Sequence, residues 1–151
     1  LADVIEKLGG KTIVYTARDL SGIGEIFDAK KVKNSLDTGK IAFLSGGTGH
    51  PYFSTDTASV LRSLELSCEM MIKCTSVDGI YSADPKKDPT AQKLSTVTYS
   101  DILTKNLRIM DQASIALARD HELKIGVCHI DTLSSLSNLA KGIFEGSTIQ
   151  K

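Results

Sequence analysis

The chain alternates between short β-rich runs and helical runs of about three turns, and this alternation constrains its fold more than any other feature. β-branched runs predict strands at residues 11–17, 40–45, 69–75 and 124–130. Apolar spacing, caps and glycine stops predict helices at residues 1–8, 28–39, 54–66, 100–105, 110–121 and from about Thr132. This order is typical of an α/β protein in which helices cover both faces of a mainly parallel sheet.

A parallel sheet collects the loops that follow its strands at one edge, where open α/β sheets bind their ligands. Three such loops follow predicted strands: residues 46–53, 75–85 and 131–134. The first two are the longest and most unusual. We therefore expect them to face one crevice.

The composition argues against several classes of function. The 151 residues are about one domain's worth, 41% of them are hydrophobic, and the formal net charge is +0. A neutral chain has no general attraction to nucleic acid or to an anionic membrane. No apolar run approaches the roughly 20 residues that span a bilayer. We recognise no signal peptide, and the reduced thiols expected below suggest a cytoplasmic protein.

The cysteines and histidines predict structural thiols and no zinc site. Cys68, Cys74 and Cys128 form no CxxC pair, and we expect them to be reduced and buried. The three histidines lack the helical HxxxH spacing that zinc sites favour.

The most informative stretch is GGTGHPYFSTDT (residues 46–57), which joins a predicted strand to a predicted helix. Gly46, Gly47 and Gly49 leave backbone N–H groups open to a close ligand, and the helix start adds a positive dipole end. With the hydroxyls of Ser54 and Thr55, the pattern favours an anion or phosphate site. A long loop with Ser54 as the helix N-cap explains the same residues equally well.

A second stretch, TSVDGIYSADPKKDP (residues 75–89), interleaves Asp78, Asp84 and Asp88 with apolar residues and Tyr81. An aromatic ring beside carboxylates suits a nucleobase and metal-bound phosphates. Tight turns that begin at Asp78 and Asp84 are the competing explanation.

Two further residues have simpler interpretations. We expect His50 to contact a ligand or solvent rather than to act as a general base. Asp111 stands near a predicted helix start, where capping explains it as well as chemistry does.

Together, GGTGHPYFSTDTA (residues 46–58) and KCTSVDGIYSADPKKDPTA (residues 73–91) resemble the bacterial uridylate (UMP) kinases of the amino-acid-kinase family. TYSDIL, RIMDQAS, LARDHELKIGV and GSTI continue the resemblance in order over nearly the whole chain. It implies a three-layer α/β/α sandwich with a mainly parallel sheet, like that of carbamate kinase. Residues 1–151 would form the C-terminal part of one amino-acid-kinase domain. The implied activity is phosphorylation of UMP to UDP by ATP in pyrimidine nucleotide biosynthesis.

The resemblance also assigns candidate contacts to both motifs. It implies UMP contacts at Thr48, Gly49, His50, Pro51, Tyr52, Phe53, Ser54 and Thr55. It implies ATP contacts at Thr75, at Tyr81 near the adenine, and at Asp84 toward the ribose and phosphates. Asp56 and Asp78 are candidate supporting groups, while no catalytic residue or metal ligand is assigned. Mg²⁺ is expected to be carried by the nucleotide phosphates, and the family implies a homohexamer.

The chain departs from the family pattern in several places. His50 stands where the family usually has Asn, Ser76 where it often has Lys, and TARDLSG (residues 16–22) where it has an SAIP-like segment. The family's KLSGE-like phosphate loop, with its lysine, and a GGG segment have no counterpart here. We therefore expect a C-terminal fragment that is inactive alone. Two alternatives stay open: an amino acid or carbamate acceptor on the same fold, and a non-catalytic nucleotide-binding module.

Overall fold

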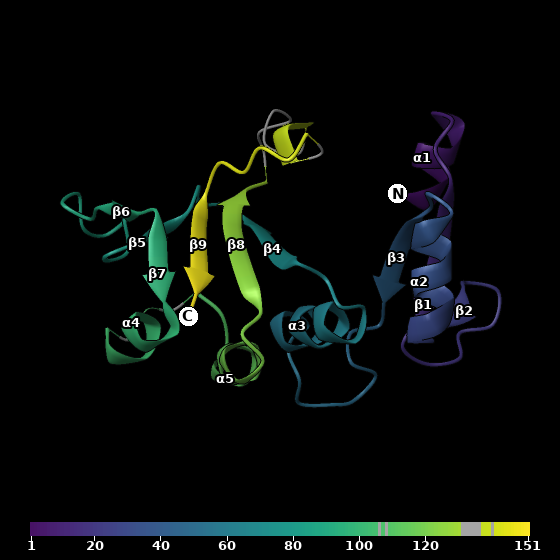
Figure 1. Cartoon of the computed structure of the whole chain (residues 1–151), viewed down its shortest axis with the longest axis horizontal. Helices are drawn as coiled ribbons and strands as arrows, with labels where there is room; N and C mark the ends of the chain where they lie inside the picture. The colour runs from purple at the N-terminus through teal and green to yellow at the C-terminus, as the bar shows by residue number, and fades with distance from the viewer. Residues whose placement is uncertain (106, 108, 131–136, 140) are drawn as a thin grey trace. The chain divides into compact units, whose positions relative to one another are not determined.

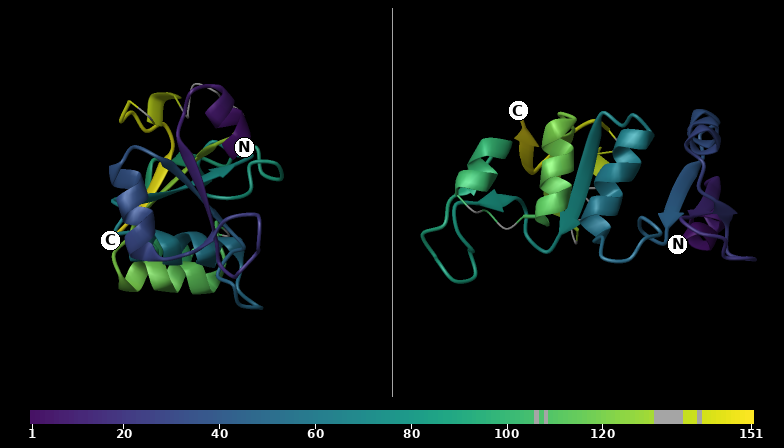
Figure 2. Two further views of the ribbon diagram at one scale, coloured as in Figure 1. Left: turned by 90° about the vertical axis from the view of Figure 1, so that its right-hand side faces the viewer. Right: turned by 90° about the horizontal axis from the view of Figure 1, so that it is seen from below.

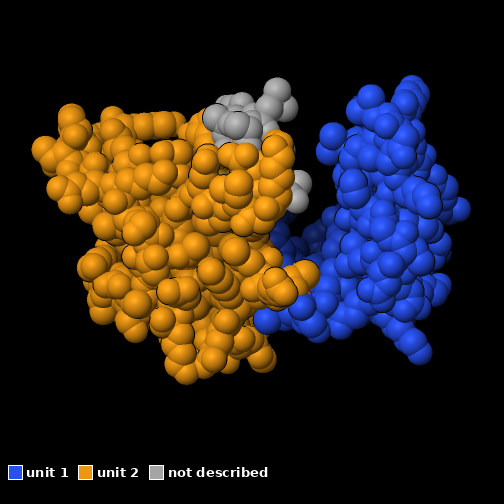
Figure 3. Space-filling view, turned by 45° about the horizontal axis from the view of Figure 1, so that its top comes forward, with its two compact units in different colours: residues 1–67 blue, residues 68–151 orange. Residues whose placement is uncertain are grey.

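The computed structural model describes residues 1–105, 107, 109–130, 137–139 and 141–151 (Figure 1). The chain divides into two compact units, residues 1–67 and residues 68–151 (Figure 3). Each unit has its own sheet.

Unit 1 is built on a three-stranded parallel sheet in the order β2-β1-β3. Its elements in chain order are α1 (Ala2–Lys7), β1 (Thr12–Thr16), β2 (Glu25–Ile26), α2 (Ala29–Asp37), β3 (Ile41–Ser45) and α3 (Thr55–Glu65). Thr16 of β1 lies opposite Ser45 of β3. The two strands therefore end together, and the segments that follow them start side by side at one edge of this sheet.

Capping residues set the helix starts in unit 1. The Asp28 carboxylate accepts the backbone N–H of Lys31 at 2.9 Å and begins α2. The buried Tyr15 of β1 shares a hydrogen bond of 3.0 Å with the Ser35 hydroxyl of α2, next to the fully buried Val32. These contacts fix α2 on the sheet.

Unit 2 contains a mixed four-stranded sheet in the order β4-β8-β9-β7 and a two-stranded hairpin, β5-β6. Its elements are β4 (Met70–Thr75), β5 (Ile80–Tyr81), β6 (Lys93–Leu94), β7 (Thr96–Thr98), α4 (Tyr99–Thr104), α5 (Gln112–Asp120), β8 (Lys124–His129) and β9 (Ser147–Gln150). The pairs β4-β8 and β7-β9 are parallel, whereas β8-β9 is antiparallel. Helices α4 and α5 lie together on one side of this sheet (Figures 1 and 2).

The core of unit 2 surrounds its central strands. Ile125, Val127 and Ile149 are fully buried on β8 and β9. The Tyr99 hydroxyl at the start of α4 donates to the Leu123 carbonyl at 2.5 Å, and burial raises the pKa of Tyr99 to about 12. Tyr99 therefore stays protonated and joins α4 to the start of β8.

The structure confirms the predicted α/β fold with mainly parallel sheets, and it places the four predicted strands in two different sheets. All four predicted strands and the predicted helices before residue 122 are present within about two residues of the expected ends. The short strands β2, β5, β6 and β7 and the last strand, β9, were not predicted. The predicted loop 131–134 and the helix start near Thr132 lie outside the described residues. Among the described residues, no helix is both long and apolar enough to cross a membrane.

All three cysteines are free thiols, as predicted, but only Cys128 is buried. Cys128 is buried, Cys74 is half-buried, and their sulfur atoms lie 3.7 Å apart on paired strands as free thiols. Burial raises the pKa of Cys128 to about 11, as expected for an unreactive structural thiol. Cys68 is exposed rather than buried, because it lies in the segment between α3 and β4.

Candidate functional site

The glycine loop of unit 1 (residues 46–53) leaves β3 in a backbone conformation that requires its glycines. Gly46, Gly47 and Gly49 have φ angles of 84°, 65° and 79°, and the Gly49 N–H closes a turn onto the Gly46 carbonyl at 3.2 Å. A Cβ atom on Gly49 would lie 3.1 Å from the carbonyl oxygen of Ala17, which follows the neighbouring strand β1. The glycines therefore permit both the turn and the close packing of two strand ends.

The start of α3 is compatible with both interpretations of Ser54 and Thr55, a helix cap and an anion site. The Ser54 hydroxyl accepts the Thr57 N–H at 3.1 Å, so Ser54 is the N-cap. Thr55 and Asp56 form the first turn, at the positive end of the helix dipole. A capped helix start directly after a glycine loop can still bind an anion, because the dipole and the remaining N–H groups serve both purposes.

The middle of the loop presents polar and aromatic side chains to the surface. The Thr48 hydroxyl oxygen accepts the N–H of the exposed His50 at 3.1 Å. Tyr52 is fully exposed with a φ of 69°, which bulky residues rarely adopt, and Phe53 is exposed beside it. Strained backbone of this kind is often found at ligand-binding loops.

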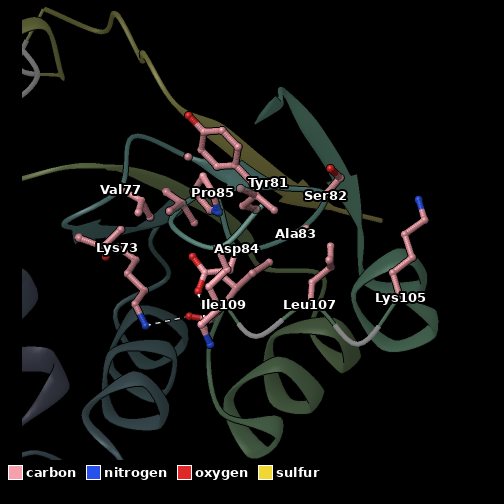
Figure 4. A pocket seen from close by; sticks show the side chains of 15 residues that line it. Lys73, Val77, Tyr81, Ser82, Ala83, Asp84, Pro85, Lys105, Leu107 and Ile109 are labelled. Carbon is pink, nitrogen blue, oxygen red and sulfur yellow. Dashed lines mark hydrogen bonds and ion pairs between the residues drawn. The ribbon is translucent and has the colours of Figure 1, made fainter. Parts of the chain in front are cut away.

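Unit 2 contains a cavity of about 580 Å³ beside the loop that follows β4, within the size range of small-molecule sites (Figure 4). The predicted ATP contacts Thr75, Tyr81 and Asp84 all line it. The other lining residues are Lys73, Val77, Gly79, Ile80, Ser82, Ala83, Pro85, Lys87, Lys105, Leu107, Ile109 and Val127. The cavity thus combines apolar walls with a few charged groups.

Asp78 lies outside the cavity lining and holds one of its walls. Its carboxylate accepts the Tyr81 hydroxyl at 2.7 Å and pairs with Lys93 at 2.8 Å. The hydrogen bond from Lys93, and to a smaller extent the one from Tyr81, holds the pKa of Asp78 below its usual value. The hydrogen bond to Asp78 in turn raises the pKa of Tyr81. The predicted supporting group therefore contacts a predicted ATP-binding residue.

The hairpin β5-β6 is fastened to the last strand by one buried serine. The Ser147 hydroxyl accepts the Ile80 N–H at 2.8 Å and donates to the Leu94 carbonyl at 2.5 Å. A Cβ atom on Gly79 would lie 2.5 Å from the Ser147 hydroxyl oxygen and 2.7 Å from Cε of Lys93. Only glycine fits at residue 79, and the hairpin places Tyr81 at the cavity through these contacts.

Asp84 serves the turn as well as the cavity. Its carboxylate accepts the Lys86 N–H at 3.0 Å, and Lys87 lies 3.9 Å from it. The turn predicted to begin at Asp84 is present, and the same carboxylate lines the cavity. The two interpretations of this aspartate are compatible.

Several cavity residues have no signal in the sequence. The Lys73 ammonium donates to the Ile109 carbonyl at 3.0 Å (Figure 4) and ties β4 to the segment before α5. Lys105 pairs with Asp101 at 2.8 Å, and that pair, with Thr98, lowers the pKa of Asp101 to about 2. Lys73 is the first residue of the motif at residues 73–91, and Ile109 lies in RIMDQAS, but neither pattern marks them as cavity residues. Leu107 lies in neither motif.

The remaining predicted residues have structural roles or stay open. Asp111 is the N-cap of α5, because its carboxylate accepts the Ser114 N–H at 3.0 Å. Among the described residues, no group of three or more His, Cys, Asp or Glu side chains could hold a metal ion. The glycine loop and the cavity belong to different units, so their expected meeting at one crevice stays a prediction.

Comparison with known proteins gives a consistent result. The sequence model described as the amino acid kinase family matches residues 1–129. The chain is 39% identical to the uridylate kinase of Saccharophagus degradans over 150 residues, covering 99% of this chain and 61% of that protein. It is 42% identical to the uridylate kinase of a Sulfurovum species over 142 residues, covering 94% and 60%. The chain thus spans about three fifths of the length of these relatives.

Solved structures agree with the sequence comparisons. The structure of UMP kinase from Ureaplasma parvum superposes with a TM-score of 0.91 and 27% identity, over 99% of this chain and 64% of that one. UMP kinase from Bacillus anthracis gives a TM-score of 0.90 and 28% identity, over 97% and 61%.

Proposed function

This chain belongs to the amino acid kinase family, and on that premise we propose that it is part of a uridylate kinase, which transfers the γ-phosphoryl group of ATP to UMP. Both units are proposed parts of one kinase domain, with unit 1 supplying the acceptor loop and unit 2 the donor site. The observation that carries the proposal is the cavity in unit 2. Three residues proposed from sequence to contact ATP line that one space.

The donor site has the features that a purine nucleotide requires. The Tyr81 side chain is held by Asp78 at the cavity, where it can face an adenine ring. Lys73, Lys87 and Lys105 place positive charge around the lining, which suits a polyphosphate. Asp84 would contact the ribose and phosphate side.

The acceptor site has the features that a nucleoside monophosphate requires. The glycine backbone and the start of α3 supply N–H donors and a positive dipole end for the phosphate. Thr48 and His50 add polar groups along the loop, and the exposed rings of Tyr52 and Phe53 suit a flat pyrimidine. The proposed UMP contacts remain residues 48–55, with Asp56 as a supporting group.

Magnesium fits this scheme as an ion carried by the nucleotide. Residues at the cavity would meet the ion through the ATP phosphates. Mg²⁺ would neutralise charge on the transferring phosphoryl group. We further propose a cytoplasmic homohexamer that acts in pyrimidine nucleotide biosynthesis, and light scattering of the purified protein tests the assembly.

The test is a coupled assay of UDP formation with the complete protein that carries this chain. We expect turnover of UMP with ATP at the 1–100 per second that is ordinary for kinases. Turnover of a carbamate or amino acid acceptor in place of UMP would overturn the assignment. ATP binding without turnover of any acceptor would show a binding module instead.

A further inference from the structure

The segment TARDLSG (residues 16–22) departs from the SAIP-like pattern of the family that the chain resembles, and the proposed contacts do not use it. The structure places its arginine against the acceptor loop. Nε of Arg18 donates to the carbonyl oxygen of Gly49 at 2.5 Å. An arginine 31 positions away in sequence is therefore hydrogen-bonded to a residue of the proposed UMP site.

The backbone around Arg18 is fixed from both sides. The hydroxyl of Thr16, which is fully buried, donates to the Arg18 carbonyl at 2.7 Å. The Ala17 N–H continues the sheet by donating to the Ser45 carbonyl at 2.9 Å. A Cβ on Gly46 would lie 3.4 Å from Ala17, and one on Gly49 would lie 3.1 Å from it. The backbone position of Arg18 therefore follows from β1 and β3.

The two arginines at this loop have different surroundings. Arg62 of α3 stacks on the Phe27 ring at 3.9 Å and pairs with Glu65 at 2.7 Å, so its charge is already compensated. Arg18 uses Nε alone, and across the described part of the chain its two terminal nitrogens have no carboxylate or carbonyl partner. Those nitrogens carry four of the five N–H groups of a guanidinium.

We propose that Arg18 binds the phosphate of the nucleoside monophosphate acceptor, an inference that rests on the proposed function. A guanidinium offers paired N–H groups that match two phosphate oxygens. The bond from Nε to Gly49 orients the group beside the same loop whose N–H groups would hold the phosphate. Arg18 thus adds a full positive charge to a site otherwise built from backbone dipoles.

The test compares UMP with uridine, which lacks the phosphate, in calorimetric titrations of the complete protein. R18Q should lower the affinity for UMP about tenfold to a hundredfold, which is the effect expected when a hydrogen bond to a charged group is lost. Uridine and ATP should bind R18Q as they bind the wild type. R18K keeps the charge and should recover part of the loss. R119Q is the matched control, because Arg119 is an exposed arginine of α5 that pairs with Asp120 at 2.8 Å.

Three results would decide against the proposal. Unchanged UMP affinity in folded R18Q would overturn it while leaving the proposed function intact. Equal losses of UMP and uridine would overturn it too, since they would show that Arg18 only supports the Gly49 backbone. Failure of the wild type and R119Q to bind UMP would overturn the proposed function itself, and this inference with it.

Discussion

The glycine loop of unit 1 and the cavity of unit 2 are built in opposite ways. The loop is one continuous run of residues whose shape is set by its own backbone and by the neighbouring strand end. The cavity is assembled from β4, the following hairpin, the segment after α4 and the centre of β8. A continuous site is visible in sequence as a motif, whereas an assembled site depends on long-range packing.

The two designs also differ in what supports them. The loop depends on a few φ angles that only glycine adopts easily. The cavity depends on side-chain contacts outside its lining, chiefly those of Asp78 and Ser147. Substitutions should therefore separate acceptor binding from donor binding.

The largest effect is expected for Gly79→Val. The new side chain would collide with Ser147 and Lys93, so the free energy of unfolding should fall by about 1–3 kcal/mol or more. ATP binding should be lost while folded protein still binds UMP. Urea unfolding and nucleotide titration at low temperature measure both. Wild-type stability in this variant would show that the hairpin does not need the close packing at residue 79.

The same substitution in the other region, Gly49→Val, should reverse the pattern. It forces a β-branched residue to adopt a φ of 79° in close contact with Ala17. The affinity for UMP should therefore fall far more than the affinity for ATP. Thr55→Ala, which removes one hydroxyl from the first turn of α3, should lower the affinity for UMP about 10- to 150-fold. Titrations in which the affinities for UMP and ATP fall equally would contradict the separation of the two sites.

A smaller loss is expected from Tyr81→Phe, which removes one hydrogen bond to Asp78. ATP affinity should fall roughly twofold to tenfold, and UMP affinity should not change. Asp78→Asn should act in the same direction. Because the pKa of Asp78 is lowered, its contribution to stability is present above the ordinary value of 3.8 and lost as the pH falls below it. An ATP affinity that is unchanged in both variants would show that Tyr81 does not contribute to the donor site.

The smallest effect concerns the Asp101–Lys105 pair at the cavity wall. The pKa of Asp101 is about 2 against an ordinary 3.8. Its stabilising contribution is therefore complete above about pH 4 and disappears as the pH falls toward 2. Urea unfolding of the wild type and D101N should differ slightly at pH 6 and converge at pH 2. A difference that stays constant over this range would contradict the ion pair.

Local signals made most helices and strands predictable. The Ser/Thr/Asp cluster predicted a helix from Ser54, and α3 begins at Thr55 with Ser54 as its cap. A helix was likewise predicted from residue 28, and Asp28 is the N-cap of α2. Capping and apolar periodicity act over a few residues, so the sequence alone carries them.

The elements that the sequence did not predict depend on pairing with residues far away in sequence. Strands of two residues, such as β5 and β6, have no period to detect. The strand β9 follows a glycine and is defined by pairing with β7 and β8, far away in sequence. The division into two sheets has no local signature either. For the same reason Tyr81 could be proposed from its motif, whereas Leu107 and Ile109 could not be.

The most direct test of the central claim is amide hydrogen exchange of the complete protein with each nucleotide separately. UMP should slow exchange at residues 46–57 and leave residues 75–87 nearly unchanged. A non-hydrolysable ATP analogue should slow exchange at residues 75–87 and leave the glycine loop nearly unchanged. Protection of the glycine loop by ATP, or of the cavity residues by UMP, would contradict the assignment of acceptor and donor to the two units.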